Sequence, residues 1–380
     1  MRSDWKKTTI DEACARVYSG GTPSTKEPAY WNGDMNWLSS GETRNKFIYE
    51  TERKITKLGV EQSSTQLAFK DSIVIATAGQ GYTRGQASFL KIDTYVNQSV
   101  LVLEADRTMV EPLFLYYNLS NRYEELRQLS DGTSTRGGLS GWIVRRMAIN
   151  LPPIDIQKKI IDVLYAIDQK IECNIAINKN LEEQVSAIYQ AWFEDFSCSD
   201  GIRPYEWTMC PLADIADVTS GKRPPVKSTY QTKETPIPIL GASSIMGFTS
   251  AENYSDHILV IGRVGTHGIV QRFNGSCWAS DNTLVIRSKF YEYVNQILQR
   301  VDYHSMNRGS TQPLITQSDI KNVAVLLPDH TTLSKFEKIV ASLMAVYESN
   351  LLESTKLIVL RDTLLPRLMS GELDVSHIEL

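Results

Sequence analysis

Residues 156–196 read IQKKIIDVLYAIDQKIECNIAINKNLEEQVSAIYQAWFEDF, and this stretch decides how the chain is organised. Its apolar residues recur every three or four positions, which is the spacing of one face of an α-helix. Asn174 and Asn178 occupy the two heptad positions where apolar residues are missing. Asp155 follows two prolines and is suited to cap the start of a helix. The pattern predicts one helix over residues 156–196, on the order of 60 Å long.

The same register returns near the C-terminal end of the sequence. Residues 336–368 repeat the apolar positions at an offset of 176 residues, and Asn350 takes the place of Asn174. Arg361 stands where the first segment has Val185. Two helices that share one pattern are expected to pair with each other, and polar residues within the seam fix their register. Pro366 is expected to kink or separate the last turn of the second helix.

The alternative is that each helix packs only on its own domain. We rank this second, because few helices of globular proteins sustain a heptad pattern for so long. The positions expected to form the seam between the two helices are Leu164, Ile167, Ile171, Asn174, Asn178, Leu181, Ile188, Val340, Leu343, Tyr347, Asn350, Leu357 and Leu364.

The charged residues follow a fourfold division of the chain. The 380 residues include 40 basic and 44 acidic side chains, which give a formal net charge of −4. Residues 1–150 and 201–328 each carry +2, whereas residues 151–200 carry −5 and residues 329–380 carry −3. This alternation indicates a tandem repeat of a globular module followed by an acidic helix. The total charge excludes a uniformly basic nucleic-acid coat but not local basic faces.

The two globular segments repeat one another more loosely. Residues 19–21 (SGG) correspond to residues 220–222 (SGK), and the β-branched run at 71–76 corresponds to 256–261. Each run predicts a buried strand. The sequence therefore predicts a duplicated α/β (α+β) module, each copy joined through a proline to a long helix. The helices expected within the two modules cover residues 113–129 and 291–303.

The sequence lacks the patterns of membrane, secreted and metal-binding proteins. No apolar run approaches the ~18 residues of a membrane span, and residues 1–10 lack the apolar core of a signal peptide. The cysteines and histidines are dispersed without the spacing of metal ligands. This dispersal indicates reduced thiols and no metal site. We therefore expect a cytoplasmic protein.

The motifs of common enzyme classes are also missing. Residues 220–222 lack the upstream glycine of a phosphate-binding loop. Residues 79–85 (GQGYTRG) resemble a dinucleotide loop only superficially, because the third glycine is misplaced and no helix-forming run follows. Residues 151–154 (LPPI) lack the polar residue and the aromatic of amino-methyltransferases. We expect the chain to have no active site of its own.

Polar, aromatic and basic side chains gather instead in the loops of both modules. Arginine can bind guanine edges, asparagine and glutamine can bind adenine, and serine, threonine and lysine can bind phosphates. For any single residue, a solvated surface loop is an equally good interpretation. The basic excess of both modules favours DNA for the set as a whole, although +2 per module is weak support. The candidate DNA-binding residues are Thr22, Ser24, Lys26, Arg44, Tyr82, Arg84, Arg136, Lys222, Arg223, Arg263, His267, Arg308 and Gln312.

Several stretches, taken in their order along the chain, carry a resemblance to a known family. They are residues 19–24 (SGGTPS), 30–37 (YWNGDMNW), 71–76 (DSIVIA), 151–160 (LPPIDIQKKI), 191–196 (AWFEDF), 309–315 (GSTQPLI) and 364–372 (LLPRLMSGE). Their order and duplication resemble the specificity (S) subunit of Type I restriction–modification systems over essentially the whole chain.

The resemblance implies two target-recognition domains held apart by two long helices that pair as an antiparallel coiled coil, with pseudo-twofold symmetry. Each domain would recognise one half of a bipartite double-stranded DNA site, and the helices would set the spacer. Because residues 22–30 and 222–230 differ, the site is expected to be asymmetric. The implied domains are 1–152 (target recognition), 153–198 (helix), 199–328 (target recognition) and 329–380 (helix).

The resemblance also implies partners that carry the chemistry. Two methyltransferase subunits would bring S-adenosylmethionine to adenine N6, and two restriction subunits can add ATP- and Mg-dependent cleavage. The chain itself would bind no cofactor. The second copy departs from the family pattern, because its helix opens with LPDHTTLS at residues 327–334 and its domain lacks the YWNGD segment of residues 30–34.

Two other functions are compatible with the residues alone. A coiled-coil scaffold whose modules bind proteins would show no salt-dependent affinity for DNA. An enzyme with an unrecognised site would have a pocket lined by strongly perturbed titratable groups, for which the sequence offers no candidate.

Overall fold

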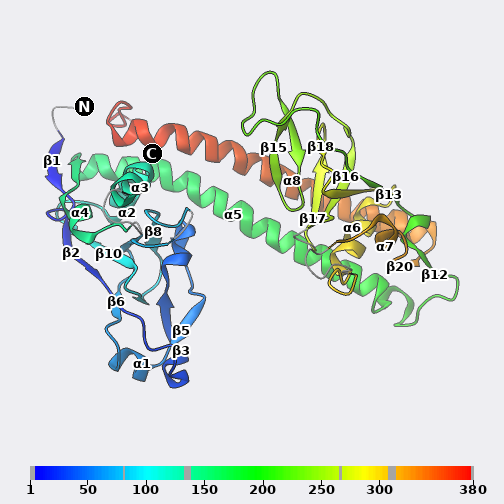
Figure 1. Cartoon of the computed structure of the whole chain (residues 1–380), viewed down its shortest axis with the longest axis horizontal. Coiled ribbons are helices and arrows are strands. Elements are labelled where there is room, and N and C mark those ends of the chain that lie inside the picture. Colours follow the sequence, from blue (N-terminus) through cyan, green and yellow to red (C-terminus); the bar gives the residue numbers. More distant parts are fainter. Residues whose placement is uncertain (1–4, 80–81, 132–137, 265–267, 307–313, 378–380) are drawn as a thin grey trace. The chain divides into compact units, whose positions relative to one another are not determined.

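The computed structural model describes residues 5–79, 82–131, 138–264, 268–306 and 314–377. The chain divides into two compact units (Figure 1). Unit 1 comprises Met1–Cys173 and Glu353–Leu380, and unit 2 comprises Asn174–Leu352. Two helices of 40 residues, α5 (Ile154–Phe193) and α8 (His330–Met369), contribute one part to each unit.

Unit 1 contains three sheets, with strand orders β2-β10-β7-β8-β4, β5-β3-β9-β6 and β1-β11. The strands are β1 (Lys6–Thr9), β2 (Cys14–Ser19), β3 (Trp31–Leu38), β4 (Phe47–Ile48), β5 (Arg53–Ile55), β6 (Gln66–Ala68), β7 (Ile73–Ala76), β8 (Ala87–Leu90), β9 (Thr94–Val96), β10 (Val100–Ala105) and β11 (Ala148–Leu151). The shorter helices are η1 (Pro28–Tyr30), η2 (Ser40–Arg44), α1 (Lys57–Glu61), α2 (Pro112–Ser120), α3 (Tyr123–Asp131) and α4 (Gly141–Arg146).

The central strand β7 is buried on both of its faces, as its unbroken β-branched run predicts. Ile73 and Ile75 point into the main core of unit 1, which also holds Leu164 of α5 and Leu368 of α8. Val74 points to the opposite face, into a smaller cluster with strand β10. The helices α5 and α8 are therefore part of the hydrophobic core of this module.

The single helix expected over residues 113–129 is wrong, because the chain forms two helices there. Helix α2 ends at Ser120 and α3 begins at Tyr123. Between them, Arg122 donates hydrogen bonds to the carbonyl oxygen of Ala148 and to the carboxylate of Glu125. These contacts to a distant strand redirect the chain, and sequence periodicity does not report them.

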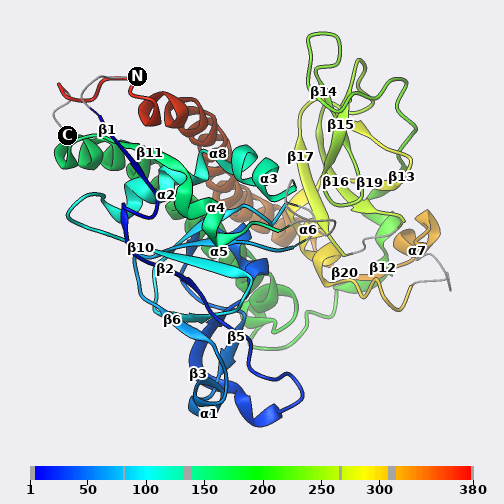
Figure 2. The same cartoon turned by 60° about the vertical axis from the view of Figure 1, so that its left-hand side comes forward.

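Unit 2 repeats this layout with strand orders β13-β19-β16-β17, β15-β14-β18 and β12-β20 (Figure 2). The strands are β12 (Thr208–Pro211), β13 (Asp217–Ser220), β14 (Ile237–Leu240), β15 (Ile245–Thr249), β16 (His257–Gly262), β17 (Val270–Asn274), β18 (Trp278–Ala279), β19 (Thr283–Arg287) and β20 (Ala324–Leu327). The helices are η3 (Ser197–Ser199), η4 (Leu212–Asp214), α6 (Tyr291–Arg300) and α7 (Gln317–Lys321).

The two modules share their main sheet and a parallel strand pair. The order β13-β19-β16-β17 in unit 2 matches β2-β10-β7-β8 in unit 1, with antiparallel neighbours throughout. The pairs β3–β9 and β14–β18 are parallel in their respective units. The duplicated α/β module expected from the sequence is confirmed.

An aromatic cluster forms the centre of unit 2. Tyr189 and Phe193 of α5, Tyr293 of α6 and Phe336 of α8 meet there, with the Phe193 ring centroid 4.8 Å from that of Tyr293 and 5.1 Å from that of Phe336. Beside the cluster, the carboxylate of Glu337 accepts hydrogen bonds from the first backbone N–H groups of α6. Burial nevertheless raises the pKa of Glu337 to about 7. The aromatic cluster fixes the module on the two long helices.

Within each unit, α5 and α8 run in opposite directions. In unit 2, Asn178 contacts Tyr347 while Tyr189, further along α5, contacts Phe336, which is earlier in α8. In unit 1, Asp168 pairs with Arg361. Every seam residue expected from the sequence is buried or partly buried, Leu357 included. The predicted pairing of the two helices is confirmed.

The ends of the long helices differ from those expected. Helix α5 begins two residues earlier and ends three residues earlier than predicted. Helix α8 continues through Pro366 to Met369 as one element, so of the two expected outcomes, a kink or a separate last turn, the separate turn is excluded. Leu368 and Met369 are buried in the core of unit 1, and this packing holds the turn despite the backbone hydrogen bond that proline cannot make.

The seam asparagines give a testable expectation for stability. Asn178 donates to the carbonyl oxygen of Tyr347 at 3.1 Å and accepts from the amide of Asn350 at 2.9 Å. Asn178→Ala leaves both partly buried partners without their hydrogen bonds to this side chain, so we expect a loss of about 1–3 kcal/mol in the free energy of unfolding. The double variant Asn178→Leu/Asn350→Leu should recover most of this loss. Chemical denaturation of the wild type, Asn178→Leu, Asn350→Leu and the double variant measures the coupling between the two side chains, and additive losses would contradict it.

Candidate nucleic-acid interface

In unit 1 the chain leaves β2 through a glycine that no other residue can replace without movement. A Cβ atom on Gly20 would lie 2.0 Å from the carbonyl oxygen of Val96. The next residue, Gly21, donates its N–H to the same oxygen at 3.1 Å. The carbonyl oxygen of Gly21 in turn accepts from the indole of Trp37 at 3.4 Å. The loop that follows is therefore held at its base by strands β3 and β9.

Unit 2 builds the corresponding loop base in the same way. A Cβ atom on Gly221 would lie 2.1 Å from the carbonyl oxygen of Ser280. Lys222 donates its N–H to the carbonyl oxygen of Ala279 at 3.0 Å, and its own carbonyl oxygen accepts from the indole of Trp278 at 2.7 Å. Each module therefore uses one glycine and one tryptophan to fix where this loop begins.

The two loops present different side chains from this shared base. In unit 1, Ser24 and Lys26 are exposed, and the partly exposed Thr22 donates its hydroxyl to Gln98 at 2.6 Å. In unit 2, Lys222 and Arg223 are both exposed. Hydroxyl and ammonium groups suit phosphate oxygens, and a guanidinium suits phosphate or guanine. The loops are equivalent in position and different in chemistry.

Two candidate DNA-binding residues of the 79–85 loop, Tyr82 and Arg84, differ in their exposure to solvent. Tyr82 is 83% exposed, and its carbonyl oxygen accepts from the hydroxyl of Tyr123. Arg84 is only 8% exposed, and its guanidinium pairs with Asp131 of α3. Tyr82 is therefore presented to solvent, whereas Arg84 supports the loop from inside and is not available for a base contact.

The remaining candidates lie in mixed surroundings. Arg44 is exposed and forms a surface ion pair with Glu52 at 2.6 Å, a kind of pair that is easily exchanged for another anion. Arg263 follows β16, where its backbone N–H donates to Asn282 and its carbonyl oxygen accepts from Ile315. Four candidates lie outside the described residues: Arg136, His267, Arg308 and Gln312.

One cation was missed by the sequence reasoning. The guanidinium of Arg53 lies 3.6 Å from the ring centroid of Trp31 and 5.5 Å from that of Trp37. The two indoles are nearly perpendicular, with centroids 5.1 Å apart. Arg53 is exposed, so this stacking holds its guanidinium at the surface of the module. Its sequence neighbours do not reveal the stacking, which joins strands β5 and β3.

The described residues offer little that is typical of catalysis. Among them, no three His, Cys, Asp or Glu side chains gather in a group that could hold a metal. Burial raises the pKa of the Cys14 and Cys277 thiols to about 12, so both stay protonated and poorly nucleophilic at neutral pH. Across the described parts of the chain, no helix has the length and apolar character needed to cross a bilayer.

Comparison with known proteins agrees with this geometry. Residues 2–183 and 204–361 match the family described as the Type I restriction modification DNA specificity domain. The specificity subunit of the Type I restriction enzyme MjaIX from Methanocaldococcus jannaschii is 25% identical, over 99% of this chain and 95% of its own length. That of HindI from Haemophilus influenzae is 22% identical, over 74% of this chain and 82% of its own.

The fold has a solved counterpart. The S subunit of a Type I restriction–modification system from M. genitalium superimposes with a TM-score of 0.64 at 19% identity, over 96% of both chains. The resemblance drawn from the sequence is confirmed by the family match, and with it the interpretation of a targeting subunit that carries no catalytic site. The chain belongs to the Type I restriction–modification specificity family and is a DNA sequence-recognition subunit.

Proposed function

We propose that each module recognises one half of an asymmetric, bipartite double-stranded DNA site. The observation that carries this proposal is the pair of loops held by Gly20 and Gly221, which share one structural base and differ in side chains. Because one chain carries two such loops with different side chains, we expect them to recognise two different half-sites. The proposed contact residues of unit 1 are Thr22, Ser24, Lys26, Arg44, Arg53 and Tyr82, with Arg136. Those of unit 2 are Lys222, Arg223, Arg263, His267, Arg308 and Gln312.

The paired helices have the second role in this proposal. We assign residues 1–152 and 199–328 to target recognition, and residues 153–198 and 329–380 to the helices that set the spacer. The helices also dock two adenine-N6 methyltransferase subunits, which bring S-adenosylmethionine, and the complex can add two restriction subunits that use ATP and Mg. All methyl transfer and cleavage would then take place in the partners.

Methylome sequencing tests the proposal directly. The full chain is expressed with its methyltransferase in a host that lacks adenine methylation at the motif. We expect two short, different half-sites separated by a fixed gap, each with a methylated adenine. A single continuous motif, or methylation that does not change when this chain is omitted, would contradict the proposal.

The salt dependence of binding tests the unit 2 loop. Lys222→Ala/Arg223→Ala removes two exposed cations, so the slope of log K against log salt should become shallower by about 0.9 for each phosphate that these side chains neutralise. Lys289→Ala is the control. It also removes an exposed cation, but Lys289 follows the C-terminal end of β19 and does not belong to the loop that carries Lys222 and Arg223. Fluorescence anisotropy of the complex on a duplex with the methylome site measures both. Equal slopes for the double variant and the wild type would exclude these phosphate contacts.

A further inference from the structure

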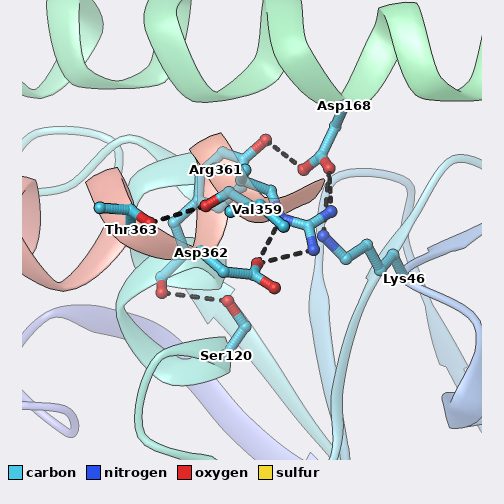
Figure 3. A network of polar contacts seen from close by, with 8 residues as sticks. Lys46, Ser120, Asp168, Val359, Arg361, Asp362 and Thr363 are labelled. Atoms are coloured by element: carbon cyan, nitrogen blue, oxygen red, sulfur yellow. Dashed lines mark hydrogen bonds and ion pairs between the residues drawn. The ribbon is translucent and has the colours of Figure 1, made fainter. Parts of the chain in front are cut away.

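One buried carboxylate in unit 1 is shared by three elements (Figure 3). Asp168 of α5 accepts from the guanidinium of Arg361 in α8 at 2.8 Å and from the ammonium of Lys46 at 3.1 Å, both through Oδ1. Its other oxygen accepts from the hydroxyl of Tyr117 in α2 at 2.9 Å. Lys46 and Tyr117 belong to the globular module, and Arg361 belongs to the paired helix. We call these four residues the polar junction.

Asp168, Arg361 and Tyr117 are the buried members of the polar junction, whereas the side chain of Lys46 is 43% exposed. The side chain of Asp168 is 2% exposed and that of Arg361 is 10% exposed. Arg361 also pairs with Asp362 at 2.7 Å. A buried charge that loses one partner is strongly destabilised, whereas an intact network restricts the elements to one arrangement. Moving the module or shifting α8 along α5 would each separate Asp168 from a partner.

At the positions of unit 2 that correspond to Asp168, Arg361 and Tyr117, all of which the structure describes, no such junction forms. The residues 176 positions away from Asp168 and Arg361 are Met344 and Val185, which are 4% and 1% exposed and lie in the apolar core. Tyr293 corresponds to Tyr117, and its hydroxyl donates to a backbone carbonyl instead. Apolar packing is not directional and tolerates small shifts. The directional contact at these positions is therefore particular to unit 1, whereas unit 2 links its module to α8 elsewhere, through Arg272, which pairs with Glu292 of α6 and at 3.7 Å with Glu348 of α8.

We propose that Asp168 and Arg361 are positioning residues, which tie the orientation of the unit 1 module to the register of α5 on α8. By fixing that orientation, the polar junction sets which spacer length the first half-site can accept. Neither Asp168 nor Arg361 is among the residues proposed to contact DNA, so substituting them acts on geometry and leaves base preference alone. This inference rests on the bipartite recognition proposed above.

The contacts around the junction supply a matched control. Glu172 lies one turn further along α5 and accepts from the hydroxyl of Tyr49 at 2.8 Å. This bond also joins the module to α5, but it does not involve α8. Glu172→Gln therefore removes a charge from the contact between the module and α5 without touching the link between Asp168 and Arg361. If loss of any charge between the module and α5 lowered the spacing preference, Glu172→Gln would lower it too.

The test uses the full chain with its methyltransferase and the bipartite site from methylome sequencing. Duplexes carry the two half-sites at the native spacing and at spacings one base pair longer or shorter, and the methylation rate is measured on each. We expect the wild type and Glu172→Gln to favour the native spacing by about tenfold. In Asp168→Asn and Arg361→Gln this preference should fall to about threefold or less, with both half-site sequences unchanged.

Folding of the variants is monitored by thermal unfolding of the complex. Arg361→Gln leaves Asp168 bonded to Lys46 and Tyr117. If Asp168→Asn unfolds, the spacing preference is therefore judged from Arg361→Gln alone. The proposal is overturned if these variants keep the wild-type spacing preference, or if they lose both half-sites together. If the wild type itself has no bipartite motif, the proposed function fails before this inference is reached.

Discussion

Phe336→Ala is expected to lower the free energy of unfolding of unit 2 by about 3–5 kcal/mol. Phe336 is fully buried, and its ring meets those of Phe193, Tyr293 and Trp192 within the aromatic cluster. Truncation would leave a cavity between two long helices and α6, where rigid neighbours from three elements cannot easily collapse. We therefore expect the largest stability change of any substitution considered for this chain.

Hydrogen exchange locates this effect as well as measuring it. Amides of α6 should lose protection in Phe336→Ala, while those of β7 in unit 1 should change much less. Val346→Ala is the matched control, because Val346 lies on the same helix and is 49% exposed, so its loss should stay within about 0.5 kcal/mol. A loss for Phe336→Ala that is no larger than that of Val346→Ala would show that the cluster does not hold the module.

Gly20→Ala and Gly221→Ala should each abolish most recognition of one half-site and spare the other. The added Cβ would lie 2.0 Å from the carbonyl oxygen of Val96 in the first case and 2.1 Å from that of Ser280 in the second. Strand or loop must move, and such overpacking costs about 1–3 kcal/mol. Since about 1.4 kcal/mol is tenfold in affinity, we expect roughly ten- to hundredfold weaker binding through the affected module.

The readout is binding of the complex to duplexes in which one half-site at a time is scrambled. With Gly20→Ala, scrambling the half-site of unit 1 should no longer matter, and Gly221→Ala should show the reverse. Gly41→Ala is the control, because the nearest atom to its Cβ would be 3.7 Å away, an ordinary contact. If either variant weakened binding at both half-sites equally, the proposal that each module recognises its own half-site would be refuted.

The duplication and the helix pairing could be predicted because both are periodic. A heptad pattern identifies the residues that face a partner helix without knowledge of the partner, and the offset of 176 residues relates the two copies. The candidate site could be predicted only in part. The loop carrying Lys222 and Arg223 was found from its resemblance to the loop after Gly20, and the structure presents both cations to solvent.

Other parts of the site depend on contacts between residues far apart in the chain. Arg84 and Arg53 look alike in the sequence, as single arginines in polar segments. Arg84 is buried and pairs with Asp131, 47 residues further along, whereas Arg53 is exposed and stacks on the indole of Trp31. Whether such an arginine is exposed depends on its neighbours in the tertiary structure, and no local sequence pattern reports it.

The sequence by itself determined that this chain is one module and one long helix written twice, because apolar periodicity and charge are properties of consecutive residues. Only the tertiary structure decided how a module is fixed to the helices. Asp168 and Arg361 are 193 positions apart, and a charged side chain is almost never fully buried unless it is paired. The two side chains can be buried together because Lys46 and Tyr117 complete the hydrogen bonding of the Asp168 carboxylate. These four residues are brought together only by folding.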